Sequence, residues 1–225
     1  MLSLLLPRRC PCCQQALLPA EGPVCLKCLA KLPRIHAEFP DNVVEERLFG
    51  QFPFEHGTSF AYYRHDGLMA HVVVQSKYLS RPWTDAQLTQ LFVQELRLAQ
   101  SPWPFDIEVI VPVPVHWLRL LKRGYNQTMS IAETLHEAWQ LPIETHCLRK
   151  THSTHSQVGL SREERLFGMR GAFSVAMPER LAGRHVLLVD DVLTTGATLV
   201  SAADALLASV PNIRLSFLTL ATAAT

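Results

Sequence analysis

The sequence lacks several features that would place it in a simple class. No apolar run approaches the roughly 18–20 residues that a membrane-spanning helix needs. No tract is of low complexity, and neither sign of charge dominates, since 21 Lys and Arg stand against 20 Asp and Glu. The start, residues 1–10, puts its arginines after a short apolar run, the reverse of a secretory signal. We therefore expect a cytoplasmic protein without a membrane span, whose total charge gives no general affinity for nucleic acid.

Cysteine is scarce outside one short segment. Five of the six cysteines lie between residues 10 and 28, and four fit C-x2-C-x11-C-x2-C: Cys10, Cys13, Cys25 and Cys28. Two such pairs supply the tetrahedral thiolate set that structural Zn²⁺ prefers, and they leave no open position for a substrate. Persistent disulfides are disfavoured in the cytoplasm. The spacing predicts a structural zinc site, with Cys12 left open as a replacement for Cys10 or Cys13, while Cys147 is expected to be a packed thiol.

The rest of the chain predicts an α/β domain. Apolar and β-branched runs indicate strands at 58–63, 107–111, 185–189 and 213–220, and helical spacing indicates helices at 67–78, 84–99, 127–139 and 199–208. Apolar strands separated by helices are typical of a parallel sheet covered on both faces. We expect a zinc-binding module over residues 1–33, an irregular linker over 34–57 and the main domain over 58–225.

The segment 186–198 carries the clearest chemical signal. An apolar strand ends in Asp190 and Asp191 and leads into a helix through a set of small and hydroxylated residues: Thr194, Thr195, Gly196, Ala197 and Thr198. Threonine hydroxyls and the amides of a helix start can donate to a phosphate, and a glycine lets the backbone approach it. The carboxylates would repel that anion unless they bound something else, and vicinal ribose hydroxyls are suitable donors. The segment predicts a ribose 5-phosphate site beyond a strand end.

These residues resemble the motif that binds 5-phosphoribosyl-1-pyrophosphate (PRPP) in type I phosphoribosyltransferases. The whole chain resembles the ComF family, which is associated with DNA uptake in natural competence. The resemblance rests on the front cysteines, Lys77-Tyr78, Val111-Pro-Val-Pro-Val-His116, Arg123-Gly-Tyr-Asn-Gln127, residues 149–165 and Gly171-Ala-Phe173. It implies a type I phosphoribosyltransferase fold, a parallel sheet flanked by helices, with an N-terminal zinc module and a site for PRPP with Mg²⁺ at Asp190, Asp191 and 194–198.

The resemblance implies roles for two further segments. A loop after the strand at 107–111 would bind pyrophosphate through these residues: Pro112, Val113, Pro114, Arg119 and Arg123. Arginines at the start of a helix are not favoured by the helix dipole, and this favours a role for them in binding an anion. The polar stretch from Arg149 to Arg165, which includes Gln157, would be a mobile loop that closes over PRPP and excludes water.

The sequence leaves the activity open. Gly168 stands where the family has Asn, which puts the second substrate site in doubt, and no side chain is recognisable as a general base. One hypothesis is an active phosphoribosyltransferase. A second is a competence factor that binds single-stranded DNA, favoured by eight Lys and Arg against five acids over residues 116–170. A third is a PRPP-sensing adaptor in which the zinc module and the core dock a partner. Single-stranded DNA and competence proteins are the partners considered. The acceptor substrate and a homodimer also stay open.

Overall fold

The computed structural model describes residues 8–18, 21–35, 42–78, 82–115, 120–121, 125–151 and 171–224. Its main element is a four-stranded sheet in the order β1-β6-β5-β2. The strands are β1 (Gly57–Tyr63), β2 (Val109–Pro112), β5 (His185–Leu193) and β6 (Arg214–Ala223). Every neighbouring pair is parallel. The α/β class expected from the sequence is confirmed.

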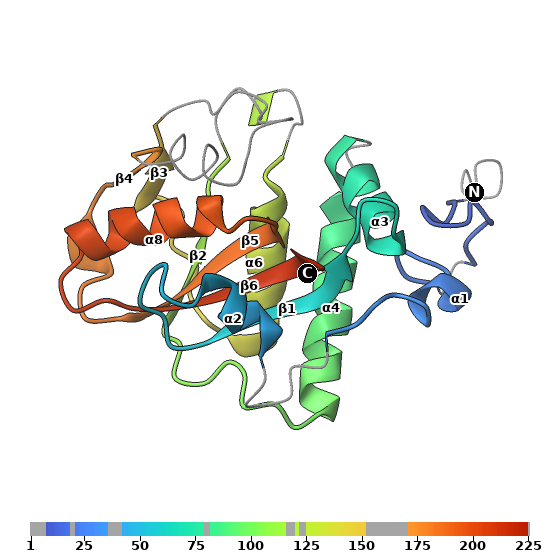
Figure 1. Cartoon of the computed structure of the whole chain (residues 1–225), viewed down its shortest axis with the longest axis horizontal. Coiled ribbons are helices and arrows are strands. Elements are labelled where there is room, and N and C mark those ends of the chain that lie inside the picture. The colour runs from blue at the N-terminus through green and yellow to red at the C-terminus, as the bar shows by residue number, and fades with distance from the viewer. Residues whose placement is uncertain are drawn as a thin grey trace.

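Helices cover both faces of the sheet because the side chains of its strands alternate in direction. Leu187 and Val189 of β5 enter one core with α3, α4 and α6, whereas Val186 and Leu188 enter a second core with α2 and α8. All four side chains are 0% exposed. Figure 1 shows α8 and α4 on opposite sides of the sheet. The helices are α2 (Val43–Leu48), α3 (Leu68–Tyr78), α4 (Pro82–Leu98), α6 (Gln127–Trp139) and α8 (Ala197–Ser209).

The path of the chain creates a crevice between β2 and β5. After β2 the chain crosses through α6 to Ile143, which forms a parallel bridge with Ile110 of β2. After β5 it crosses through α8 in the other direction, to β6. The two crossovers diverge between β2 and β5, and ligands of open α/β sheets bind at such a point, outside the carboxyl ends of the strands.

Smaller elements complete the described chain. They are α1 (Leu26–Leu29), β3 (Leu148–Lys150), β4 (Phe173–Val175) and the 3-10 helix η2 (Pro178–Arg180). The strands β3 and β4 form an antiparallel hairpin. Cys147, just before β3, is fully buried and donates through Sγ to the Met177 carbonyl, as a packed thiol was expected to do. Among the described residues, no helix combines the length and apolar character needed to cross a membrane.

Two expectations about local structure were wrong. The linker at 34–57 is not irregular throughout, because it contains α2, which begins after the N-cap Asn42. The strand at 185–189 does not end before the two aspartates but continues through both of them to Leu193. Pairing with β6 carries it on, since Asp190 is in register with Thr219 and Val192 with Ala221.

Candidate functional site at the carboxyl ends of the strands

A cavity of about 470 Å³ opens where β2 and β5 end. We call it the strand-end cavity. Its walls combine the segment after β2, the two aspartates, the turn into α8, and residues from β1, α3, α6 and β3. The lining residues are Tyr63, His65, Val73, Val74, Val113, Pro114, Val115, Gln127, Thr128, Lys150, Asp190, Asp191, Val192, Thr194 and Thr198. The cavity lies at the switch point of the sheet, where a ligand is expected.

The two aspartates differ in exposure because they alternate along β5. Asp190 is 9% exposed, and its Oδ1 accepts a hydrogen bond from the backbone N–H of Asp191 at 2.9 Å. Asp191 is more accessible, and both residues line the strand-end cavity. The strand thus presents two adjacent carboxyl groups at the cavity, whose oxygens can accept hydrogen bonds from hydroxyl groups or coordinate a hard cation.

The turn between β5 and α8 places a helix start beside these carboxyl groups. Gly196, the N-cap of α8, has a φ of 82° and no side chain with which to cap the helix. The Ala197 N–H contacts Thr195 Oγ1 at 3.4 Å, and the side chains of Thr194 and Thr198 lie at the cavity. The positive end of a 13-residue helix favours an anion here.

The structure separates the other expected site residues into three groups. Val113 and Pro114 line the strand-end cavity, while Pro112 is the last residue of β2. Arg149 does not begin a loop but lies within β3, paired with Ser174 of β4, so its expected position was wrong. Three residues lie outside the described ranges: Arg119, Arg123 and Gln157.

Sequence reasoning missed much of the cavity wall. Tyr63 stands at the carboxyl end of β1, and its position at a strand end was a usable signal. Lys150 reaches the cavity from β3, where its Nζ also lies 5.2 Å from the centre of the Phe173 ring. Val73 and Val74 of α3 are brought there by packing of the helix, which no local motif indicates.

The cysteines of the front segment converge as their spacing predicted. One sulfur each from Cys10, Cys13, Cys25 and Cys28 lies within 4.8 Å of the others. Burial raises the pKa of the Cys10 thiol, but hydrogen bonds, first from the backbone of Cys25, outweigh burial and lower it to about 6. Four converging sulfurs, one with a lowered pKa, suit a closed tetrahedral metal site.

Cys12 is not one of the four cysteines whose sulfurs all lie within 4.8 Å of one another. Its Sγ donates to the backbone carbonyl of Leu68, the first residue of α3, at 3.5 Å. Burial, and then the charge of Cys10, raise its pKa to about 12. The geometry therefore selects Cys10 and Cys13 over Cys12 as the first pair of ligands.

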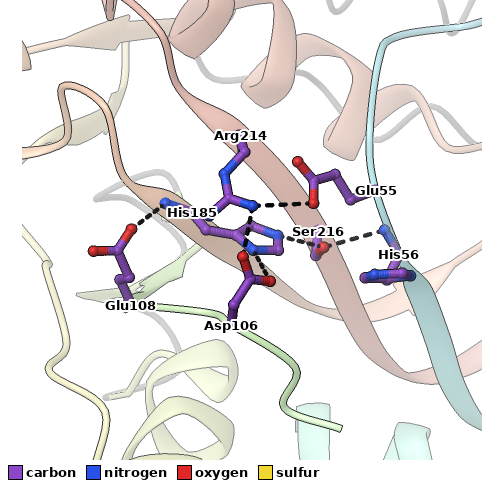
Figure 2. A network of polar contacts seen from close by, with 7 residues as sticks. All are labelled: Glu55, His56, Asp106, Glu108, His185, Arg214 and Ser216. Carbon is purple, nitrogen blue, oxygen red and sulfur yellow. Dashed lines mark hydrogen bonds and ion pairs between the residues drawn. The ribbon is translucent and has the colours of Figure 1, made fainter. Parts of the chain in front are cut away.

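A second cluster of titratable groups lies at the opposite, amino end of β5 and β6 (Figure 2). The His185 ring contacts Asp106 Oδ1 through Nδ1 at 2.9 Å and Ser216 Oγ through Nε2 at 2.8 Å. This Ser-His-Asp order resembles a hydrolase triad. However, His185 and Ser216 are both 0% exposed, so the hydroxyl cannot meet a substrate. The His185 ring instead joins the start of β5 to β6 and to the segment before β2.

The same cluster could be mistaken for a metal site, because Glu55, Asp106 and His185 bring three ligand atoms together. A cation is already present among them. Arg214 Nη1 lies 2.6 Å from Asp106 Oδ2 and 3.3 Å from Glu55 Oε2. The guanidinium neutralises both carboxylates and ties the start of β6 to the segments that precede β1 and β2 (Figure 2).

A model of the family described as phosphoribosyl transferase domain matches residues 122–223. Competence protein F of Haemophilus influenzae is 32% identical over 130 residues, which are 57% of this chain and 57% of that protein. The DNA utilization protein YhgH of Salmonella typhimurium is 28% identical over 89% of this chain and 79% of its own length. Competence protein ComFC of Bacillus subtilis is 26% identical over 88% of this chain and 77% of its own length.

Two solved structures show a weaker similarity. The glutamine PRPP amidotransferase of B. subtilis, complexed with ADP and GMP, has a TM-score of 0.41 and 20% identity over 64% of this chain and 30% of its own. An adenine phosphoribosyltransferase has a TM-score of 0.41 and 17% identity over 64% of this chain and 73% of its own. Together, the parallel sheet, the family model and the sequence relatives show that the chain has a phosphoribosyltransferase fold and is similar to competence and DNA utilization proteins.

Proposed function

We propose that this protein binds PRPP, or another ribose 5-phosphate ligand, in the strand-end cavity and serves DNA uptake in natural transformation. One observation carries the first part. Adjacent carboxyl groups and the amino end of α8 line the same cavity of about 470 Å³. A cavity with acceptors on one side and anion-binding donors on the other suits a sugar phosphate better than a purely anionic or purely apolar ligand.

Each part of the ligand has a matching part of the wall. The carboxylates of Asp190 and Asp191 would accept hydrogen bonds from two neighbouring ribose hydroxyls. The amides and hydroxyls of residues 194–198 would donate to the 5-phosphate, and Gly196 allows the close approach. The segment 112–114 would hold the pyrophosphate group, with Lys150 as the described cation at the cavity.

Two metal ions are part of the proposal. Zn²⁺ would be held by Cys10, Cys13, Cys25 and Cys28, whose clustered sulfurs match its preferred ligands. Mg²⁺ would enter with PRPP, and the oxygens of Asp190 and Asp191 are hard donors of the kind it takes. When bound, it would neutralise charge on the pyrophosphate. The boundaries of the units, with the zinc module over 1–33, a connecting stretch over 34–57 and the main domain over 58–225, belong to the same proposal.

The role in DNA uptake is supported by the relatives, whose names refer to competence and DNA utilization. We place the protein in the cytoplasm, where imported single strands and competence proteins would be its partners. The basic residues Arg119, Lys122 and Arg123, which favour DNA binding in the sequence, lie outside the described residues.

Ligand binding is tested by titration calorimetry with PRPP and Mg²⁺. Asp191→Asn should weaken binding by roughly ten- to a hundredfold, because hydrogen bonds to a charged group are worth about 1.5–3 kcal/mol. Asp204→Asn is the matched control, since Asp204 is an exposed aspartate of α8 that does not line the cavity. Absence of PRPP binding by the unmodified protein would refute the proposal.

An active phosphoribosyltransferase is the second candidate, favoured by the family model over residues 122–223. The measurement is pyrophosphate release from PRPP with a panel of nucleobases and with single-stranded DNA. Release that depends on one base would establish transfer to that base. Tight PRPP binding without release under any condition would instead support a binding or adaptor role.

A further inference from the structure

The short helix α2 packs against the turn that joins β5 to α8. Its N-cap Asn42 accepts hydrogen bonds at Oδ1 from the N–H groups of Val44 and Glu45, at 3.1 and 3.4 Å. Asn42 Nδ2 donates to the carbonyl of Gly57 at 2.6 Å, and Glu45 Oε1 accepts from the Gly57 N–H at 2.8 Å. The helix is therefore fixed to the start of β1, one edge of the sheet.

Arg47 of α2 joins two segments that lie far apart in the sequence. Its Nη1 donates to the backbone carbonyl of Thr194 at 3.1 Å, and its Nη2 donates to the carbonyl of Ala223 at the end of β6. The Arg47 carbonyl in turn accepts from Gln51 Nε2 at 2.8 Å. The planar guanidinium can bond two acceptors at once, which an ammonium group does with less geometric control.

Leu48 makes the second contact with the same turn. It is 0% exposed, and its Cδ2 lies 2.4 Å from the position that a Cβ would take on Gly196. The backbone of Gly196 thus passes directly against the leucine. Two neighbouring residues of α2 therefore contact the 194–196 turn. Arg47 binds the carbonyl of its first residue, and Leu48 packs against its last residue.

We propose that Arg47 and Leu48 are positioning residues of the phosphate site. This inference rests on the proposed function, and it adds α2 to the machinery of the site. Neither residue lines the strand-end cavity, so both act through the turn. Arg47 binds the Thr194 carbonyl, and an oxygen held in this way is not aimed at an anion. The amides and hydroxyls of the turn are then left to face the phosphate.

The first test needs no ligand. Hydrogen–deuterium exchange at the amides of residues 194–198 is compared in the zinc-loaded full chain, Arg47→Gln, Arg47→Lys and Arg97→Gln. Arg97 is a matched control because it also donates to a backbone carbonyl, that of Ala138, at 2.8 Å and away from the turn. We expect faster exchange in both Arg47 variants, because lysine keeps the charge but not the two-carbonyl geometry, and no change in Arg97→Gln.

The second test measures the dissociation constants of PRPP and of inorganic phosphate for the same proteins. Arg47→Gln should weaken both by about tenfold, the usual effect of losing a charged hydrogen bond. Far-ultraviolet circular dichroism and the unfolding midpoint show whether each variant is folded under the assay conditions, and Arg47→Lys provides a milder change if Arg47→Gln is not.

The outcomes separate the two proposals. If the unmodified protein binds neither ligand while exchange still rises in the Arg47 variants, the proposed function fails and the support of the turn by α2 stands. If the protein binds PRPP but Arg47→Gln changes neither exchange nor affinity, the positioning role is overturned. The role is also overturned if Arg97→Gln weakens binding as much as Arg47→Gln does, since the effect would then be general.

Discussion

Gly196 meets two requirements at once, a positive φ of 82° and direct contact with Leu48. Gly183 has a similar φ of 70°, but nothing lies within 4 Å of its Cβ position. We expect Gly183→Ala to lower the free energy of unfolding by roughly 1–2 kcal/mol, the cost of a left-handed alanine. Gly196→Ala should lower the free energy of unfolding by the same amount and by about 1–3 kcal/mol more, because its Cβ would overpack against Leu48. Urea titrations measure the free energy of unfolding of the two variants. An equal decrease in both would show that Leu48 moves aside without cost.

Individual residues also show what a sequence can reveal about a site. The residues 194–198 were found because they are contiguous and combine hydroxyl groups with a glycine. The positions of Tyr63, Lys150 and Val74 at the cavity could not be found in this way, since packing brings them together from separate elements. No sequence pattern indicates the role of Arg47, because its hydrogen-bond partners are backbone carbonyls, which any residue provides.

At the scale of elements, the contacts of Asp106 hold the amino ends of β5 and β6 together. The hydrogen bond from Arg214, and then the one from His185, lower the pKa of Asp106 from 3.8 to about 2. A carboxyl group whose pKa is lower in the folded state stabilises the protein above its unfolded pKa. That contribution is lost as the pH falls from about 4 to about 2.

Asp106→Asn should therefore reduce the dependence of unfolding free energy on pH between pH 4 and 2. Urea unfolding at several pH values measures it, with Asp66→Asn as control because Asp66 is an exposed aspartate in a turn. An Asp106→Asn curve parallel to that of the unmodified protein would show that the interaction with Arg214 contributes nothing to the pH dependence.

Long helices and strands were predicted from the sequence more accurately than short ones. The helix expected at 127–139 has those bounds, since its 13 residues are long enough to give a clear apolar period. The six residues of α2 give too short a pattern, although Asn42 followed by Glu45 is a helix-start signal that could have been used. The strands β3 and β4 have three residues each and depend on pairing with each other, so no local period indicates them.

At the scale of the whole molecule, the cysteine cluster shares a core with the main domain. Cys10 and Cys25 belong to the same group of buried residues as Phe60 of β1 and Met69 of α3. In Figure 1, α1 lies beyond α3, on the side away from the sheet. The hydrogen bond from Cys12 Sγ to the Leu68 carbonyl links this segment directly to α3. Loss of metal should therefore disturb α3, whose valines form part of the cavity wall.

We expect one zinc ion per chain, and Cys25→Ser should lose it and lower the melting temperature in a single transition, because structural zinc contributes directly to folding. Cys12→Ser should keep the zinc. Elemental analysis and calorimetry measure the two properties. A separate early transition in Cys25→Ser, with the main transition unchanged, would show that the module folds independently of the sheet.

The position of β6 has a consequence for biosynthesis. This strand, residues 214–223, lies between β1 and β5, and its Ala223 shares the Arg47 guanidinium with the turn at Thr194. When residue 198 has been synthesised, the chain already contains Asp190, Asp191 and the turn between β5 and α8. At that stage β6 is missing, so no strand yet connects β1 to β5. We therefore expect the proposed ligand to bind in the strand-end cavity only after residue 223 has left the exit tunnel, and not to a shorter nascent chain.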